Sequence, residues 1–536
     1  MPGGLLNIIS AGKANLILTG NPSKTFFKVT YSKYTNFGMQ KFRLDYDGLR
    51  ELRLTESSKF TFKMKRYADL LMDTYLVLNL PDIWSPIYEP SAQTNSQYSP
   101  YDFKWIENLG VQCIEEIEIF AGSQLLQKYS GQYLHAMIQR DFSTDKKDLI
   151  NAMTGNVPQI NDPANDPARV YAPPYKPNTY PSAQHTNNSA GAEPSIRGKT
   201  IYVPINAWFT LDSRCAFPLV ALQYQELTIN VTIRPIQDLF QVRDVFNYAD
   251  NFPYIKIRAG ENQFQMYRFL QTPPSLDLSS TNYSNKTNNW NADVHLLSTY
   301  CFLSEEEQAK FAAEDQVYLV KEIHEYDFLN VVGSNRVKLE STTGLVADWM
   351  WYFQRNDAFL RNEWSNYTNW PYKTIPSNIV LDNPSQLYIT GNYDGTNNKP
   401  ILETFGILFG PDYREISMPR GVYDYVEKYT KTQGFAGEGL YCYNFCLNTS
   451  PFEYQPSGAV NAGRFKTIEL EFTTYLPPVS VDGSTMSIEC TDGTPVNISS
   501  KPAWALYVYN YNLHVFEERY NIISFVSGNC GLVYAR

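Results

Sequence analysis

The chain lacks the residue patterns that zinc-dependent and nucleotide-binding enzymes require. None of its five histidines lies four residues from another, and no Cys-x-x-Cys pair occurs, although zinc helices and zinc ribbons use these spacings. The glycine-rich stretch at 434–439 is not followed by Lys-Ser/Thr or a helical pattern, so it predicts a flexible turn and not a phosphate-binding loop. No Gly-x-Ser-x-Gly elbow is present, and only a Ser-His-Asp triad built from distant residues stays open. We therefore predict no enzymatic activity and no catalytic, cofactor-binding or metal site.

A cysteine framework and a long apolar run are also missing. Seven cysteines are spread over 536 residues, and an odd number leaves at least one thiol free, which suits a reducing compartment. No run of 18 apolar residues occurs, so we expect no transmembrane helix. The first apolar stretch, at 5–9, follows no basic segment, and we therefore expect no signal peptide.

Charged residues are scarce and aromatic residues are abundant. Only 19% of the residues are charged, 15% are aromatic, and 40 are tyrosines. Aromatic residues favour β-strands, and tyrosine is common where proteins contact one another. A chain of this length also exceeds what one hydrophobic core supports. The composition therefore predicts at least two β-rich domains.

Alternating and apolar runs predict strands in both halves of the chain. Ser304 and Glu307 predict a capping box at the start of a helix. Polar passages rich in Pro, Asn and Ser, at 158–204 and 361–399, predict one long surface loop in each half. The predicted strands lie at 26–31, 59–64, 74–80, 114–120, 201–209 and 227–234, then at 294–302, 316–323, 349–354, 401–409, 440–447 and 465–472, and two short helices are expected at 132–140 and 145–153.

The segment Tyr454–Arg464 places turn-forming residues between two of these strand-like runs. Pro456 fixes φ, and Gly458 and Gly463 allow positive φ. We expect a late connection that sets the geometry in which neighbouring strands pair. No group in it is poised for chemistry.

The order of motifs along the chain resembles that of the major capsid proteins of nucleocytoplasmic large DNA viruses. The Gln455-Pro456-Ser457-Gly458 sequence, followed by Asn461 and Arg464, is similar to a segment near the end of those proteins. Further matches in family order are Gly3-Gly4-Leu5-Leu6, residues 18–22 and 25–28, residues 105–110 and 114–122, Tyr202-Val203-Pro204 with Trp208-Phe209 and 217–227, and 503–512 with 520–534. The resemblance implies an all-β fold of two consecutive eight-stranded jelly-roll β-sandwiches, with long loop insertions and a few short helices.

The resemblance also implies a domain division and a function. We expect an N-terminal arm at 1–25, a first jelly roll at 26–245 and a second at 246–536. A chain of this family is expected to form a homotrimeric, pseudo-hexameric capsomer that tiles the icosahedral shell of a large double-stranded DNA virus. The expected partners are other copies of the chain and minor capsid and penton proteins. The expected location is the virion, with assembly in the cytoplasm of the infected host cell.

Charge is distributed unevenly along the chain. Residues 1–66 carry twelve Lys or Arg and four acids, a net charge of +8, whereas the whole chain carries −10. A basic N-terminal region on an acidic body suits an inner membrane or another anionic layer. The alternative is that these residues are ordinary solvated strand faces. No helix-turn-helix, zinc-finger or RNA-binding signature accompanies the charge, so we expect no sequence-specific binding of nucleic acid.

Several Asn-x-Ser/Thr sequons lie in predicted loops, and two other functions stay open. Because outer loops carry sugars in some relatives, we consider glycosylation at four positions: Asn187, Asn282, Asn285 and Asn366. Trp364, Trp370 and Tyr367 have an exposed-looking setting that suggests a carbohydrate-binding or carbohydrate-active β-sandwich protein. The other alternative is a minor or vertex capsid protein, although such proteins usually need a single jelly roll.

Overall fold

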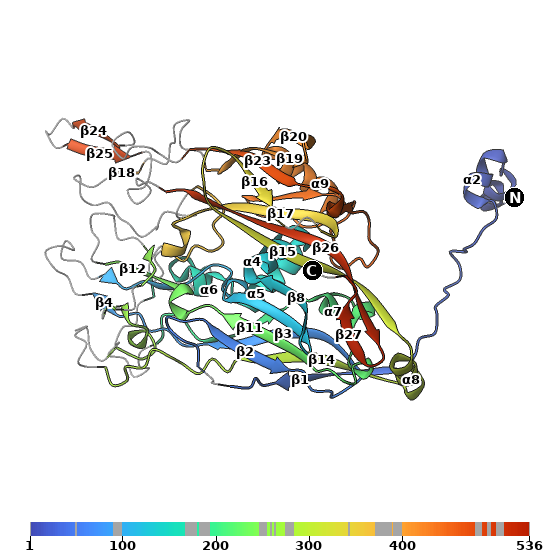
Figure 1. Ribbon diagram of the computed structural model, residues 1–536, viewed down its shortest axis with the longest axis horizontal. Helices are drawn as coiled ribbons and strands as arrows, with labels where there is room; N and C mark the ends of the chain where they lie inside the picture. Colours follow the sequence, from blue (N-terminus) through green and yellow to red (C-terminus); the bar gives the residue numbers. More distant parts are fainter. Residues whose placement is uncertain are drawn as a thin grey trace.

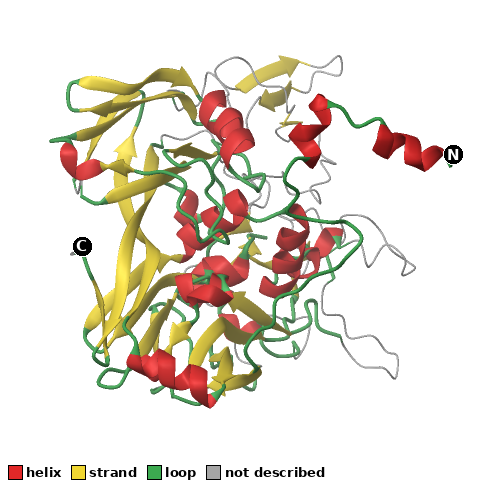
Figure 2. Ribbon diagram, turned by 90° about the vertical axis from the view of Figure 1, so that its right-hand side faces the viewer, coloured by secondary structure: helices red, strands yellow, loops and turns green. Residues whose placement is uncertain are grey.

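The computed structural model contains two jelly-roll β-sandwiches in succession, as predicted (Figure 1). It describes residues 2–48, 51–88, 99–166, 180–181, 193–245, 254–257, 260–261, 264–273, 283–340, 343–369, 388–389, 399–476, 485–489, 495–499 and 509–534. Figure 2 shows strands over most of the body and short helices between and beside them. Within the described residues, no helix is both long enough and apolar enough to cross a membrane.

The first sandwich consists of two facing sheets, here named the β1 sheet and the β2 sheet. Its strands alternate because every second side chain enters the core. In β7, for example, Ile117 and Ile119 are fully buried while Glu116 and Glu118 point outward. The β1 sheet is β1 (Phe37–Leu44), β14 (His295–Leu303), β3 (Leu70–Leu80) and β10 (Phe217–Pro218), with β9 (Lys199–Pro204) beside β3, and the β2 sheet is β2 (Ser58–Lys63), β11 (Leu227–Ile233), β7 (Ile114–Ala121) and β8 (Gln124–Ser130).

The second sandwich repeats this strand order in a β15 sheet and a β16 sheet. Strand β17 is apolar on both faces, and Trp349 and Trp351 are almost completely buried on it. The β15 sheet is β15 (Gln316–Val331), β26 (Tyr511–Val526), β17 (Leu345–Arg355) and β21 (Leu440–Asn444), with β22 (Val460–Asn461) and β27 (Asn529–Leu532) at its edges, and the β16 sheet is β16 (Ser334–Leu339), β23 (Ile468–Thr474), β19 (Leu402–Phe409) and β20 (Asp412–Pro419).

Smaller elements connect and cover the sandwiches. Both helices expected in the first half are present, as α4 (Gly131–Asp141) and α5 (Thr144–Thr154). The remaining helices are α1 (Gly3–Ile9), α2 (Leu16–Thr19), α3 (Leu109–Gln112), α6 (Pro158–Asn161), α7 (Trp208–Leu211), α8 (Glu305–Ala313), the π-helical turn η11 (Val422–Val426) and α9 (Glu427–Lys431), and the short strands are β4 (Ile87–Tyr88), β5 (Ser99–Pro100), β6 (Phe103–Trp105), β12 (Phe240–Arg243), β13 (Tyr254–Ile255), β18 (Tyr388–Ile389), β24 (Thr485–Glu489) and β25 (Pro495–Ser499).

The N-terminal arm is longer than predicted. The strand expected at 26–31 does not form, and the first strand, β1, begins at Phe37. The apolar side chains at 26–31 have no core to enter, because all of residues 2–36 are exposed. Figure 1 shows this segment leading away from the body. The arm therefore ends near residue 36 and not at 25.

The boundary between the sandwiches also differs from the prediction. Strand β14, expected to open the second domain, pairs with β1 and β3 and closes the first sandwich. Strand β14 therefore does not belong to the second jelly roll, whose first strand is β15 after α8. Ser304 precedes α8 as expected, but its side chain makes no capping hydrogen bond. The run at 201–209 is also divided, because β9 ends at Pro204 and α7 begins at Trp208.

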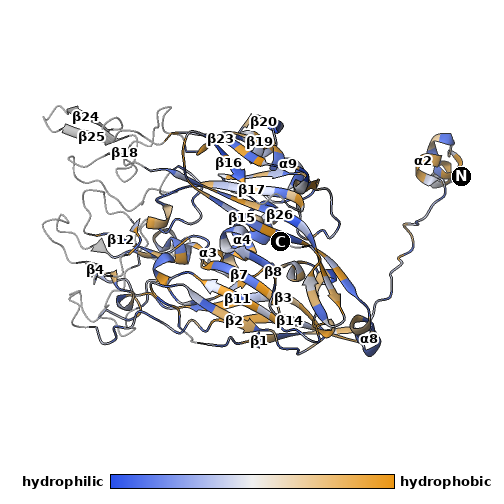
Figure 3. Ribbon diagram, viewed as in Figure 1, coloured by the Kyte–Doolittle hydropathy of each residue, from blue (hydrophilic) through white to orange (hydrophobic). Residues whose placement is uncertain are grey.

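Hydropathy follows this architecture. Figure 3 shows apolar positions along the strands within each sandwich and a concentration of them in the arm. One apolar core fills the first sandwich and extends into the β15 sheet through Met350, Tyr352 and Phe516. A separate core lies inside the second sandwich. The two sandwiches therefore share packed side chains.

The segment Tyr454–Arg464 joins β21 to β23, which lie in different sheets of the second sandwich. It is a late connection in the second jelly roll, as predicted, but it crosses between sheets and does not join paired strands. Gly458 has φ of +139°, and a Cβ there would lie 2.9 Å from the carbonyl oxygen of Phe445. Gly463 is part of the 3-10 turn Ala462–Arg464 and shows no positive φ.

We expect the Gly458→Ala substitution to lower the free energy of unfolding by about 1–3 kcal/mol, because a strained backbone and a close contact add to each other. Gly437→Ala is the matched control, since nothing lies within 4 Å of its Cβ position. The midpoint of urea unfolding measures both effects. Equal midpoints for the two variants would contradict the strain at Gly458.

Candidate functional site at the junction between the two sandwiches

Helix α4 connects the sandwiches, and its sequence suits a position with protein on both sides. The helix follows edge strand β8, and the Ser130 side chain caps it by accepting a hydrogen bond from the Tyr133 backbone N–H. Gly131 allows a close approach to the backbone oxygens of Val111 and Ile114. All of its residues except Gln132 and Gln139 are buried. A helix buried nearly all round needs apolar contacts on both faces.

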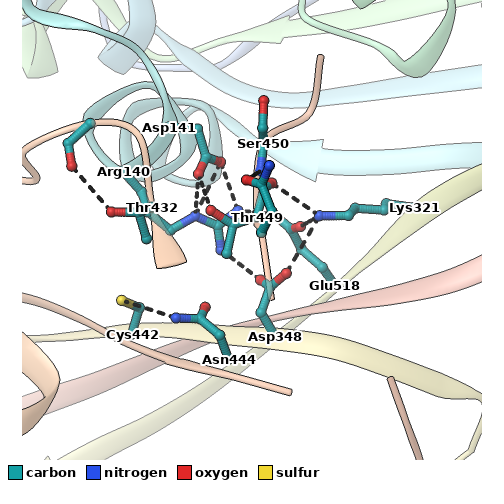
Figure 4. Close-up of polar contacts among 12 residues, drawn as sticks. Arg140, Asp141, Lys321, Asp348, Thr432, Cys442, Asn444, Thr449, Ser450 and Glu518 are labelled. Carbon is teal, nitrogen blue, oxygen red and sulfur yellow. Dashed lines mark hydrogen bonds and ion pairs between the residues drawn. The ribbon is translucent and has the colours of Figure 1, made fainter. Parts of the chain in front are cut away.

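A buried cluster of charges lies where α4 meets the β15 sheet (Figure 4). Arg140 contributes from α4 and pairs with its neighbour Asp141, with Asp348 on β17 at 2.6 Å and with Glu518 on β26 at 2.9 Å. Lys321 on β15 completes the cluster, since its Nζ lies 2.7 Å from Glu518 and 3.5 Å from Asp348. Arg140, Asp141 and Asp348 have no exposed side-chain surface. The cluster therefore links a helix of the first sandwich to three strands of the second.

Hydrogen bonds to neutral groups complete the cluster. The Tyr133 hydroxyl donates to Glu518 at 2.9 Å, and the Thr449 hydroxyl donates to Asp141 at 2.6 Å. Buried carboxylates need such donors because they have lost their water. Thr449 follows β21, so the cluster also holds the connection to Tyr454–Arg464 in place.

The cluster shifts the pKa values of its carboxyl groups in different directions. Burial raises the pKa of Asp348 to about 6, although Arg140 opposes the shift. Burial also acts to raise the pKa of Glu518, but the charges of Arg140 and Lys321 and their hydrogen bonds outweigh it and lower that pKa to about 2. Three carboxylates face two cations, so the fully ionised cluster carries one excess negative charge. Burial raises the pKa of Asp141 as well, so Asp348 and Asp141 take up a proton before Glu518 does as pH falls.

Apolar contacts surround the charges. The rings of Tyr133 on α4 and Phe516 on β26 lie 5.7 Å apart in an edge-on arrangement. Tyr352 packs against Phe516, and its hydroxyl donates to Gln132 at 2.5 Å. These side chains surround the fully buried part of the cluster, where the low polarity strengthens each ion pair.

A second contact between the sandwiches is made by residues 361–369, which follow β17 and lie against the first sandwich. The Asn362 amide donates to the backbone oxygens of Gln237 and Phe240 at 2.7 and 2.8 Å. The Trp364 indole N–H donates to the Asp238 backbone oxygen at 2.9 Å. Burial also raises the pKa of Glu363 in this segment to about 8. These residues attach the second sandwich to the first.

The aromatic side chains considered for carbohydrate binding take part in this attachment. Tyr367 is 5% exposed, and its ring stacks on Tyr352 with centroids 4.1 Å apart. The guanidinium of Arg234 lies over the Trp364 ring at 4.2 Å. The expectation that these two residues are exposed is therefore wrong. Trp370 lies outside the described residues.

The Tyr454–Arg464 segment borders the same junction. A cavity of about 90 Å³ is lined by Tyr454, Gln455 and Pro456 together with Tyr133, Lys321 and Glu518. The Ser457 hydroxyl accepts hydrogen bonds from the backbone N–H groups of Leu447 and Asn448. This segment therefore shapes the contact between the sandwiches as well as the turn after β21.

The four candidate glycosylation positions differ in whether the structure describes them and in whether they are exposed. Asn187 and Asn282 lie outside the described residues. Asn285 is exposed and stays a prediction. Asn366 is 5% exposed and its amide donates to Glu363 at 2.9 Å, so the prediction of a surface sequon at this position is wrong. Its loop is folded against the first sandwich instead of projecting into solvent.

The described cysteines and acidic residues form no metal site. Among the residues that the structure describes, no group of three His, Cys, Asp or Glu side chains has a geometry that could hold a metal ion. The six described cysteines are all buried and free. Cys490 lies outside this part of the chain.

The charge cluster was not predicted, but the sequence contains a signal for it. Asp348 interrupts the apolar run of β17, and Glu517-Glu518-Arg519 interrupts that of β26. Charged residues within buried strands are costly unless they are paired. Such interruptions indicate a buried partner, although the sequence does not identify it as Arg140.

Comparisons with known proteins agree with this architecture. Residues 25–268 match the family model described as "Major capsid protein N-terminus". The major capsid protein of Phaeocystis pouchetii virus is 22% identical over all of both chains, and that of Paramecium bursaria Chlorella virus 1 is also 22% identical over all of both chains. Among solved structures, VP54 of PBCV-1 superposes with a TM-score of 0.61 at 18% identity, covering 96% of this chain and all of VP54. The Faustovirus major capsid protein superposes with a TM-score of 0.60 at 12% identity, covering 97% of this chain and 96% of that protein.

The fold and its junction are those of a double jelly roll. Within that class, the chain is similar over its whole length to the major capsid proteins of nucleocytoplasmic large DNA viruses, and residues 25–268 match the model of their N-terminal part. The predicted family, fold class and location in the capsid are confirmed.

We expect Arg140→Ala to destabilise the protein by about 3–5 kcal/mol, because it leaves buried carboxylates without their cation. Arg53→Ala is the matched control: Arg53 pairs with Glu56 on the surface, and such pairs contribute less than about 1 kcal/mol. Chemical unfolding followed by tryptophan fluorescence measures both. A loss at Arg140 no larger than that at Arg53 would show that the cluster does not hold the sandwiches together.

Proposed function

We propose that three copies of the chain form a homotrimeric, pseudo-hexameric capsomer that tiles the icosahedral shell of a large double-stranded DNA virus. The observation that carries the proposal is that both sandwiches have the same strand order and stack through one helix. Three such pairs arranged about a threefold axis place six similar units in a ring. A nearly hexagonal block covers a flat facet without gaps. One solved structure similar to this chain, with a TM-score of 0.59, is described as the PBCV-1 virus capsid.

The competing carbohydrate function loses its support in this structure. Tyr367 and Trp364 are packed at the junction and are not arranged on an open surface.

Minor capsid and penton proteins are proposed as further partners of the capsomer. Capsomer assembly is proposed to take place in the cytoplasm of the infected cell.

The native mass of the purified chain tests the capsomer. One copy has a mass of 61.5 kDa, and we expect light scattering to give three times this value over a wide range of concentrations. A monomer that binds or cleaves glycans would overturn the proposal. Glycan-array binding of the same sample provides that second measurement.

We further propose that the N-terminal arm contacts an anionic membrane beneath the shell. Residues 1–36 contain four lysines and no acid. Phe26 and Phe27 are 87% and 99% exposed, and the apolar side chains of α1 and α2 are also exposed. Basic and apolar side chains together favour binding at the interface of an anionic bilayer.

Neutralising Lys24, Lys28 and Lys33 to Gln is expected to reduce binding of the capsomer to vesicles that contain anionic lipid by roughly 10²-fold, at about 1 kcal/mol per cation. Changing the same three residues to Arg keeps the charge and serves as the control. Vesicle co-sedimentation at low and high salt measures the binding. Unchanged binding of the Gln variant would contradict a membrane role, and unchanged retention of inner-layer components in assembled shells would contradict it independently.

A further inference from the structure

The two sandwiches correspond to each other element by element. In chain order, β1, β2, β3, β7 and β8 of the first sandwich match β15, β16, β17, β19 and β20 of the second, and the sheet orders β1-β14-β3-β10 and β15-β26-β17-β21 are the same. Helix α4 follows edge strand β8, and η11 with α9 follows edge strand β20. The η11–α9 segment is therefore the counterpart of α4, and it differs in beginning with a π-helical turn.

These counterpart helices have different surroundings. Leu134, Met137 and Ile138 on α4 are at most 3% exposed, because the second sandwich covers the helix. On the η11–α9 segment, Tyr425 is 56% exposed, Val426 54% and Tyr429 91%. Large exposed apolar side chains grouped on one helix are typical of a surface that binds another protein.

The surface that covers α4 also has a counterpart, on the β1 sheet. Asp348 and Met350 on β17, with Phe516 on β26, face α4. At the matching positions, β3 carries Asp73 and Tyr75, and β14 carries Leu297, which pairs with Tyr75 just as Phe516 pairs with Met350.

An irregularity in strand pairing supports this correspondence. The register of β17 against β26 shifts between Val346 and Asp348, and the register of β14 against β3 shifts between Ser298 and Tyr300, opposite Asp73. Each aspartate thus lies next to a bulge. Met350 and Phe516 are buried, whereas Tyr75 and Leu297 are only half-buried, and Met39 on the neighbouring β1 is 59% exposed.

Within a single copy, the helix surface on η11–α9 and the outer face of the β1 sheet therefore remain uncovered. They belong to different sandwiches. Figure 1 shows the β1 sheet at the lower end, α4 between the sandwiches and α9 beside the second sandwich in the upper part of the molecule. The acceptor at one end and the helix at the other differ in shape, so their contact is heterologous. A heterologous contact closes into a ring when its rotation is suitable.

We infer that the exposed η11–α9 segment, centred on Tyr429, docks on the outer face of the β1 sheet of a second copy, around Met39, Asp73 and Tyr75. This contact repeats between copies the packing of α4 on the β15 sheet within one chain. The inference rests on the proposed capsomer and assigns the surfaces that build it.

Single substitutions on the two surfaces test the assignment. Tyr429→Asp and Met39→Asp change side chains that are largely exposed within one copy, so each variant is expected to fold normally by circular dichroism. Each is expected to shift the native mass from the trimer to the 61.5 kDa monomer. Leu149→Asp is the matched control, since Leu149 is 62% exposed on α5, away from both surfaces, and it is expected to remain trimeric.

Mixing the two variants tests the pairing itself. The Met39→Asp copy keeps its helix surface and the Tyr429→Asp copy keeps its sheet surface, so a mixture can form one intact contact but no closed ring. We expect a species of twice the monomer mass in the mixture and in neither variant alone. If each surface instead bound the same surface of another copy, mixing the two variants would not increase the amount of this species.

Cross-linking locates the contact in the unperturbed capsomer. Tyr429→Cys and Met39→Cys in the same chain are expected to give intermolecular cross-links with a short bismaleimide, whereas each single variant and the parent give none. The six described native cysteines are buried, and the parent protein controls for Cys490.

The outcomes separate the inference from the function on which it rests. A monomeric parent protein would overturn both the capsomer and the docking surfaces. A trimer that survives both Asp substitutions and gives no Tyr429–Met39 cross-link would overturn only the surfaces. Loss of the trimer in the Leu149 control to the same extent would also count against them, because it would show that the contact is not confined to the two ends.

Discussion

The burial of Arg140 among three carboxylates fixes how the two sandwiches lie on each other. Each sandwich has a core of its own, and apolar contact alone would allow sliding between a helix and a sheet. Buried ion pairs tolerate little displacement, because each separated charge would remain desolvated. The positions of α4, β15, β17 and β26 are thus set by charges that must meet. We regard orientation, and not extra stability, as the main contribution of the cluster, since buried ion pairs often add little net free energy.

A fixed orientation within the chain matters because the capsomer must repeat it. A pseudo-hexagonal ring closes only when the angle between successive sandwiches is the same within a chain and between chains. A flexible junction would place the η11–α9 segment and the β1 sheet at variable angles and prevent closure. The second attachment, made by residues 361–369, restricts the same angle, since its Tyr367 stacks on Tyr352 of β17 and its Asn362 and Trp364 bind the first sandwich. The arm at 2–36 lies outside this rigid body.

Local patterns predicted much of the fold, and their failures have physical causes. Alternation located β2, β7, β11 and β23 to within a few residues, because each has one buried face. The run at 26–31 shows the same apolar character without a strand, since a strand forms only where a neighbour supplies its hydrogen bonds. The run at 294–302 was recognised as a strand but assigned to the wrong domain, because its partners β1 and β3 lie more than 200 residues earlier. Asn366 and Tyr367 were expected on a loop surface, and their burial depends on the docking of that loop on another domain.

The sequence by itself determined the fold class, the family and the number of sandwiches, because strand periodicity, turn residues and motif order are local properties. The Gln455-Pro456-Ser457-Gly458 segment, together with the other motifs in family order, indicated the family, but not the two sheets between which it crosses. The tertiary structure alone decided where the first sandwich ends, which charges meet at Arg140 and which helix remains uncovered. These features depend on residues hundreds of positions apart that become neighbours only when both sandwiches are packed. The two residues of a buried ion pair can lie any number of positions apart in the sequence, so only the folded chain identifies them.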